Sequence, residues 1–167
     1  SQGLLSASHR SSEFLAICEK AIKGMYKVMR IPSDYHVLFQ PSATASMECV
    51  LRNLIRKKSY HVTHGAFSQR FLSTAQELCL ETEVLNTPWN EVPSWESIEL
   101  AEDVEALVIT HNETSTGLMW PETVMKSLKE RFSDRLIIYD ITSSFASMPF
   151  DWTLGDVWFF SIQKCLG

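Results

Sequence analysis

The segment LIIYDITSS, residues 136–144, decides the fold of this chain. It opens with four apolar residues in a row, without the polar alternation of a half-buried strand. Such a run is typical of a strand buried on both faces of a sheet. Asp140 follows directly, and Thr142, Ser143 and Ser144 come after it. The segment therefore predicts a buried strand that ends in a cluster of polar side chains.

Two further segments repeat this pattern. The apolar run ALVIT (106–110) leads into the polar loop HNETSTG (111–117), and DVWFFSI (156–162) leads into Gln163 and Lys164. Ligands of open parallel sheets gather at the carboxyl ends of the strands. We therefore expect the chemistry of this protein at the edge where these strands end.

Strands and helices alternate along the rest of the chain. Shorter strands are predicted at 36–40, 59–63 and 83–86. Apolar residues at helical spacing predict helices at 13–30, 44–57, 67–79 and from Pro121 onward. The alternation favours an α/β fold with a mostly parallel main sheet that helices cover on both faces.

Composition narrows the class of protein. Hydrophobic residues make up 45% of the 167 residues and charged residues 21%, which is typical of a folded domain. The net charge of −5 argues against a nucleic-acid surface. No apolar run reaches the roughly 20 residues of a membrane span. The four cysteines lack CxxC spacing, and we interpret them as buried thiols of a cytoplasmic protein.

The two ends suggest a piece of a longer protein. The chain begins at Ser1 instead of Met and stops at Gly167, just after Lys164. We divide it into an N-terminal segment and helix (1–30) and a truncated large domain (31–167), and we expect a C-terminal small domain to be absent.

Each polar group has a functional and an ordinary interpretation. The segment PSATAS (41–46) before a helix is either an anion cradle or a capped turn. The loop 111–117 is either part of a site or a turn, and Asp140 either pairs with a buried cation or bonds its own turn. Lys164 is either a solvated charge or, among its apolar neighbours, a nucleophile. Together the four would make one cofactor pocket.

At this point the residues resemble a known family. HNETSTG, YDITSS (139–144) and SIQKCLG (161–167) are similar in order and spacing to the class V aminotransferases, which depend on pyridoxal 5'-phosphate (PLP). SHRSSEF (8–14), PSATASME (41–48) and HGAFSQR (64–70) fit the same family. The resemblance spans nearly the whole chain but only about half of a full-length member. It implies the large domain of fold type I PLP-dependent transferases.

The resemblance also implies roles for single residues. Lys164 would hold PLP through its amine, and Asp140 would pair with the pyridine nitrogen. The remaining cofactor-binding residues would be Ala43 and Thr44 at the phosphate with Gln163, Phe67 stacked on the ring, and Thr114 beside the ring hydroxyl. His9 and Arg10 would bind the substrate.

Within the family the chain resembles phosphoserine aminotransferases most. This implies transamination between O-phosphoserine and 2-oxoglutarate, in the cytoplasm and by a homodimer. Phe67, the absence of a glycine-rich phosphate loop and the HNETSTG segment leave open an alanine or serine aminotransferase that uses glyoxylate or pyruvate. A cysteine desulfurase-like lyase and an inactive truncated fragment are further alternatives.

We expect no metal site, no nucleic-acid partner and no membrane partner. His61 and His64 stand at i and i+3, and on a strand such residues point to opposite faces. They are therefore poorly placed to share a metal ion.

Overall fold

The computed structural model describes residues 8–165, and contacts divide the chain between Phe39 and Gln40 into two units. The first unit contains helix α1 (Ser12–Met29), which confirms the helix predicted at 13–30. The Ser11 hydroxyl caps it by accepting the Phe14 N–H at 3.2 Å. Our division of the chain at residue 30 stays a prediction.

The strand predicted at 36–40 is wrong. These residues form an irregular segment that pairs with no strand of residues 8–165. Leu38 and Phe39 are 77% and 60% exposed, so the apolar run that suggested a buried strand is not buried in the described chain.

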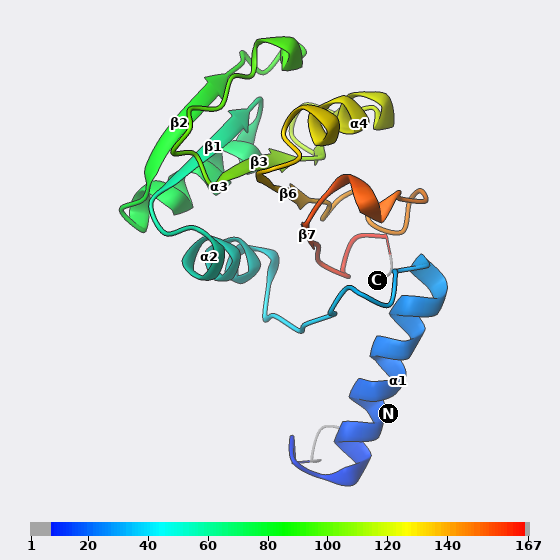
Figure 1. Cartoon of the computed structure of the whole chain (residues 1–167). Coiled ribbons are helices and arrows are strands. Elements are labelled where there is room, and N and C mark those ends of the chain that lie inside the picture. Colours follow the sequence, from blue (N-terminus) through cyan, green and yellow to red (C-terminus); the bar gives the residue numbers. More distant parts are fainter. Residues whose placement is uncertain (1–7, 166–167) are drawn as a thin grey trace. The chain divides into compact units, whose positions relative to one another are not determined.

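The second unit is built on a five-stranded sheet in which every pairing is parallel. Its strand order is β2 (Glu81–Asn86), β1 (Lys58–Thr63), β3 (Ala106–Thr110), β6 (Leu136–Asp140) and β7 (Val157–Phe159). Figure 1 shows these strands fanning across the second unit. The sheet confirms the predicted α/β class, although β7 is shorter than the predicted 156–162.

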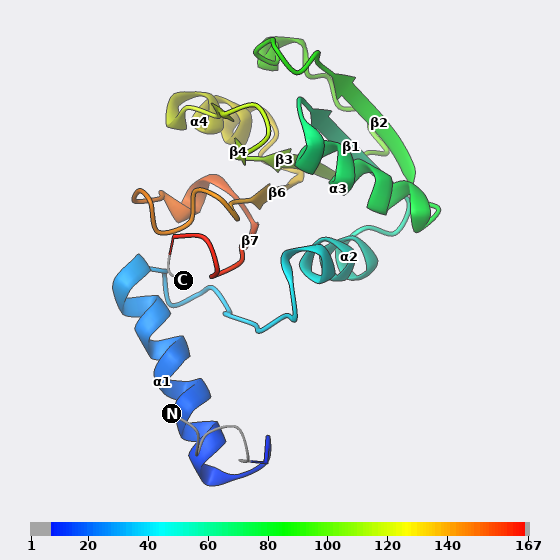
Figure 2. The ribbon, with the colours of Figure 1, turned by 180° about the vertical axis from the view of Figure 1, so that it is seen from behind.

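Helices cover both faces of this sheet. On one face, α2 (Ala43–Leu54) and α3 (Ala66–Glu77) pack in one core with alternate strand residues, among them Val108 and Ile138. Side chains alternate along a strand, so Leu107 and Ile137 point to the other face. There α4 (Glu122–Arg131) buries Met125 and Leu128, and Figures 1 and 2 place it opposite α2 and α3.

Short elements connect these layers. The connection between β2 and β3 contains one 3₁₀ turn, η2 (Trp95–Ser97), and a second, η3 (Trp152–Leu154), precedes β7. The polar loop after β3 folds back as an antiparallel pair, β4 (Asn112–Glu113) with β5 (Leu118–Met119), which the sequence did not reveal.

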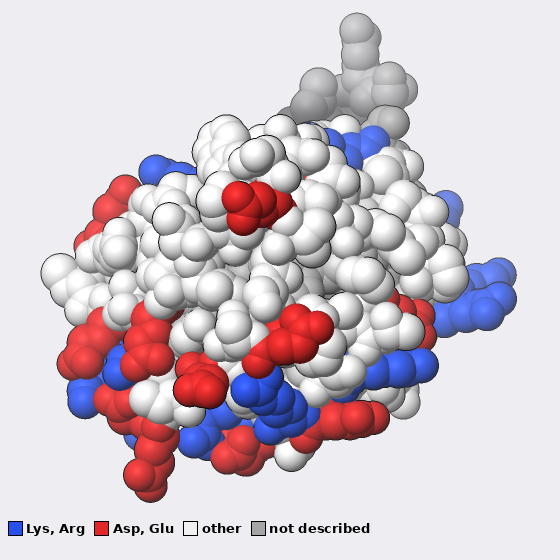
Figure 3. Space-filling view, turned by 90° about the horizontal axis from the view of Figure 1, so that it is seen from above, with Lys and Arg blue, Asp and Glu red and all other residues white. Residues whose placement is uncertain are grey.

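The surface carries charges of both signs. Figure 3 shows acidic and basic side chains interspersed along one edge of the face that it draws. Within the second unit, Lys57 pairs with Asp103 at 3.5 Å and Lys129 with Asp156 at 2.8 Å. None of the helices in residues 8–165 combines the length and apolarity that crossing a membrane requires.

The prediction of buried cysteines is wrong. Cys79 and Cys165 are exposed, and Cys18 and Cys49 are half-buried. The sulfur atoms of all four are free thiols.

Candidate functional site

The ends of three neighbouring strands meet at one edge of the sheet. Thr110, the last residue of β3, is in register with Asp140, the last residue of β6. Asp140 is in turn in register with Phe159 of β7, so the segment that carries Lys164 leaves the sheet at the same edge. Parallel pairing thus brings together groups that are distant in sequence.

A cavity of about 410 Å³ lies at this edge, between the first turns of α2 and α3 and the strand ends. Its volume falls in the range of small-molecule sites, roughly 300–1,000 Å³. Every cofactor-binding residue predicted from the sequence lines it: Ala43, Thr44, Phe67, Thr114, Asp140, Gln163 and Lys164.

Asp140 is the buried acid of this cavity, with 4% of its surface exposed. It continues the row of Ile138, which points toward α2 and α3. Its Oδ1 accepts the backbone N–H of Thr142 at 2.9 Å. Burial raises the pKa of Asp140, hydrogen bonding from Thr142 opposes this, and the charge of Glu113 adds to the rise. A cation placed beside Asp140 would lower that pKa again.

Lys164 and Phe67 are distant along the chain but close in space, and both line the cavity. The Lys164 Nζ is 5.9 Å from the centroid of the Phe67 ring. Phe67 is 43% exposed and lines the cavity. Lys164 is exposed, which agrees with the interpretation as a solvated charge and not with a side chain held among Val157 to Phe160.

The first turn of α2 lines one side of the cavity. Ser42 caps the helix by accepting the Ala45 N–H at 3.0 Å, so the capped-turn interpretation is correct. Ala43 and Thr44 occupy the first two helical positions, whose N–H groups have no partner within a helix. Capping and anion binding are therefore compatible here, because these N–H groups and the helix dipole favour a phosphate.

The donor set fits PLP. Besides Asp140, the cavity is lined by Thr110, whose buried Oγ1 has no hydrogen-bond partner among residues 8–165. The cavity thus combines a carboxylate, an unpaired hydroxyl, an amine, an aromatic face and a helix N-terminus. A phosphorylated, aldehyde-bearing pyridine ring offers a complementary group to each of them.

Sequence reasoning missed several lining residues. It overlooked Thr110, although the strand-end rule applied to it, and it gave no role to Arg70. Arg70 lies three residues after Phe67, a spacing that puts both on one face of a helix. That spacing was the available signal.

His9 and Arg10 belong to the first unit, where both side chains are exposed. Their predicted role at the substrate stays a prediction, and they are not among the residues that line the cavity.

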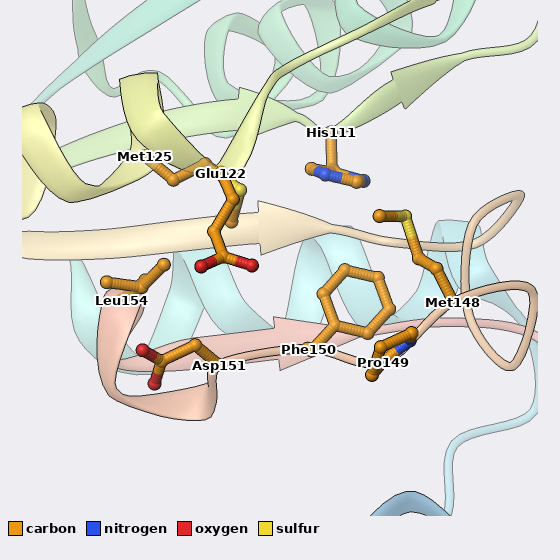
Figure 4. Close-up of a pocket in the computed structure, with 8 residues that line it drawn as sticks. All are labelled: His111, Glu122, Met125, Met148, Pro149, Phe150, Asp151 and Leu154. Carbon is orange, nitrogen blue, oxygen red and sulfur yellow. The ribbon is translucent and has the colours of Figure 1, made fainter.

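A second cavity on the α4 side is too small to be a ligand site. Its volume is about 10 Å³, at most the space of one water molecule. Figure 4 shows the His111 ring facing Phe150 and Met148 across it, and the His111 and Phe150 rings are 5.3 Å apart. Burial lowers the pKa of His111 to about 4, so the ring is neutral near pH 7. We interpret His111 as a core residue.

Comparison with known proteins agrees with this geometry. The family model described as aminotransferase class-V matches residues 1–167. The chain belongs to the class V aminotransferase family. Enzymes of this family depend on PLP, so the family, the fold and the cofactor inferred from the sequence are confirmed.

Several relatives carry one name. A phosphoserine aminotransferase of a Nocardioides species is 30% identical, and the match covers 97% of this chain and 43% of that protein. One of Corynebacterium glutamicum is 29% identical, with coverages of 99% and 43%. The chain thus spans less than half the length of these relatives.

Solved structures extend the comparison. A phosphoserine aminotransferase of Cytophaga hutchinsonii is 36% identical, with a TM-score of 0.94, and the match covers 99% of this chain and 46% of that one. An aspartate aminotransferase of Thermus thermophilus is 25% identical, with a TM-score of 0.81 and coverages of 95% and 47%. The fold is shared between enzymes with different amino donors.

Proposed function

We propose that the complete protein is a PLP-dependent aminotransferase that uses O-phosphoserine as amino donor and 2-oxoglutarate as acceptor. The observation that carries this proposal is the shared cavity, because all seven predicted cofactor-binding residues line it. The choice of substrate is supported by the relatives named phosphoserine aminotransferase.

The residues of the cavity divide the work of holding the cofactor. Lys164 supplies the amine that retains it, and the first turn of α2 binds its phosphate together with Gln163. Phe67 fixes the plane of the ring, and Thr114 bonds beside the ring hydroxyl. When bound, PLP supplies an electron sink for the substrate Cα.

Asp140 and Lys164 then act on protons. Asp140 holds a proton on the pyridine nitrogen, and such charge-assisted bonds contribute roughly 1.5–3 kcal/mol. The amine of Lys164 also removes the proton from the substrate Cα as a general base. The buried setting of Asp140 strengthens its interaction with a cation.

His9 and Arg10 are our candidates for the substrate. Arginine and a protonated histidine suit a phosphate, because both donate charge-assisted hydrogen bonds. We also propose a homodimer in the cytoplasm, and the four free thiols favour a reducing compartment.

A spectrum of the complete protein with PLP tests the role of the cavity. The wild type is expected to show a lysine-dependent visible absorbance band that Lys164→Ala abolishes. Lys20→Ala, an exposed lysine of α1, serves as the matched control and should keep the band. An unchanged band in Lys164→Ala contradicts the proposal.

Amino-donor assays test the substrate. Phosphoserine, alanine and serine are compared as donors, and phosphoserine is expected to give the highest kcat/KM. Preference for alanine or serine with glyoxylate would instead assign the protein to the other branch of the family.

A further inference from the structure

Glu113 is a fully buried carboxylate that the proposed function does not use. It ends β4 with 0% of its surface exposed. Buried carboxylates are costly unless they are hydrogen-bonded. Ser68 donates to it from its backbone N–H at 2.8 Å and from its hydroxyl at 3.0 Å. Ser115 donates from its hydroxyl at 2.7 Å and its N–H at 3.2 Å, and the Phe67 N–H donates at 3.3 Å.

These donors place Glu113 at the start of α3. The helix has Gly65 at its N-cap position, so no side chain of its own caps it. Glu113 accepts from the second and third helical residues, Phe67 and Ser68. Ser115 accepts from the first, Ala66, at 2.9 Å. A segment almost 50 residues away in the chain therefore caps α3.

The approach is close enough to require glycine. A Cβ at position 65 would lie 2.3 Å from the Glu113 Cγ and 2.5 Å from the Ser115 Oγ. Both distances are far below a van der Waals contact, so Gly65 is fixed by the position of Glu113.

Two residues that line the cavity, Phe67 and Thr114, belong to the segments that this cap joins. Phe67 belongs to the first turn of α3, and Thr114 stands between the two residues that make the cap. We propose that Glu113 is a positioning residue that locks Phe67 and Thr114 to each other, so that the ring-binding walls of the cavity keep a fixed separation. This inference rests on the proposed PLP site.

The test uses PLP affinity and the visible circular dichroism of bound PLP, in the complete protein. Glu113→Gln replaces one carboxylate oxygen by an NH₂ group, which donates and cannot accept. The groups of Ser68, or those of Phe67 and Ser115, therefore lose their acceptor. We expect PLP to bind about ten-fold more weakly, because part of its binding energy is then spent on ordering the two walls that Glu113 no longer holds. We also expect a smaller visible dichroism, because the ring walls are no longer held. Glu91→Gln, an exposed acid, should match the wild type.

The outcomes separate the two claims. A folded Glu113→Gln protein that binds PLP with wild-type affinity and dichroism overturns the positioning role. A wild type that binds no PLP overturns the proposed function instead. Should Glu113→Gln not fold, Ser115→Ala decides, since this residue is exposed and contributes two bonds of the cap. Its PLP affinity is expected to fall about three-fold, and an unchanged affinity and dichroism would overturn the inference.

Discussion

Asp140 and Glu113 are two buried carboxylates beside the same cavity, and they have opposite surroundings. Both are almost fully buried, at 4% and 0% exposure, and none of the ion pairs among residues 8–165 includes either. Five hydrogen bonds converge on Glu113, whereas Thr142 donates to Asp140. Burial by itself raises the pKa of Glu113, but its hydrogen bonds outweigh this and lower it. The pKa of Asp140 is raised.

The difference indicates a structural role for Glu113 and a ligand-binding role for Asp140. The protein itself satisfies Glu113, so this carboxylate stabilises a local structure. Asp140 lines the cavity without comparable partners, and perturbed groups of this kind gather at functional sites. A cationic ligand group would give Asp140 the charge partner that it lacks among residues 8–165.

The largest expected effect is on turnover. In the complete protein, Asp140→Asn is expected to lower kcat on the order of 10²–10³-fold, because it removes a charge that acts in the transition state. PLP should remain bound through the other residues of the cavity. Steady-state kinetics with a PLP absorbance spectrum measures both, with the exposed Asp134→Asn as control. Full activity of Asp140→Asn would refute the role of this carboxylate.

The second effect is on stability. Glu113→Ala leaves the N–H groups of Phe67 and Ser68 and the hydroxyls of Ser68 and Ser115 without this acceptor, and we expect a loss of about 2–4 kcal/mol in the free energy of unfolding. Urea unfolding measures it. Glu91→Ala, on the exposed surface, should change that free energy by less than about 0.5 kcal/mol. A Glu113→Ala protein as stable as this control would contradict the cap.

These two acids also show how far sequence reasoning reaches. Asp140 was predictable, because a buried strand delivers its next residue to the carboxyl edge of a parallel sheet. The role of Glu113 was not predictable, since it depends on the contact between residues 113 and 68, which no local pattern encodes.

The same distinction explains the errors in the fold. The runs at 106–110 and 136–140 carried their own signal and formed strands. The run at 36–40 has similar residues but no pairing strand in the described chain, so its local propensity was not realised. The β4–β5 pair depends on a turn between two-residue strands, which leaves too short a pattern to recognise.

The third prediction concerns pH. For an acid with a raised pKa in the folded state, stability falls as pH rises from the unfolded value, about 3.8, through the folded pKa. Each pH unit in that window costs up to about 1.4 kcal/mol. Cofactor-free Asp140→Asn should therefore gain stability over the wild type as the pH rises above about 3.8, measured by urea unfolding at several pH values.

For Glu113 the free energy of unfolding should change with pH in the opposite direction. Its lowered pKa contributes stability above about 4.5 that is lost as pH falls through the folded value. The advantage of the wild type over Glu113→Gln should therefore shrink on acidification. If the stability differences of Asp140→Asn and Glu113→Gln from the wild type changed with pH in the same direction, the contrast between the two acids would be wrong.

The smallest expected effects come from deleting one hydroxyl at each site. Thr110→Val removes a buried hydroxyl that has no partner in residues 8–165, so the cofactor-free protein should keep its stability or gain up to about 1 kcal/mol. Ser115→Ala removes a hydroxyl that donates to Glu113 and accepts from Ala66, so about 1 kcal/mol should be lost. Thermal unfolding of the two cofactor-free variants compares them directly. If both variants lost stability equally, the Thr110 hydroxyl would have a hydrogen-bond partner in the cofactor-free protein. The contrast between the unpaired groups of the cavity and the hydrogen-bonded cap of α3 would then be wrong.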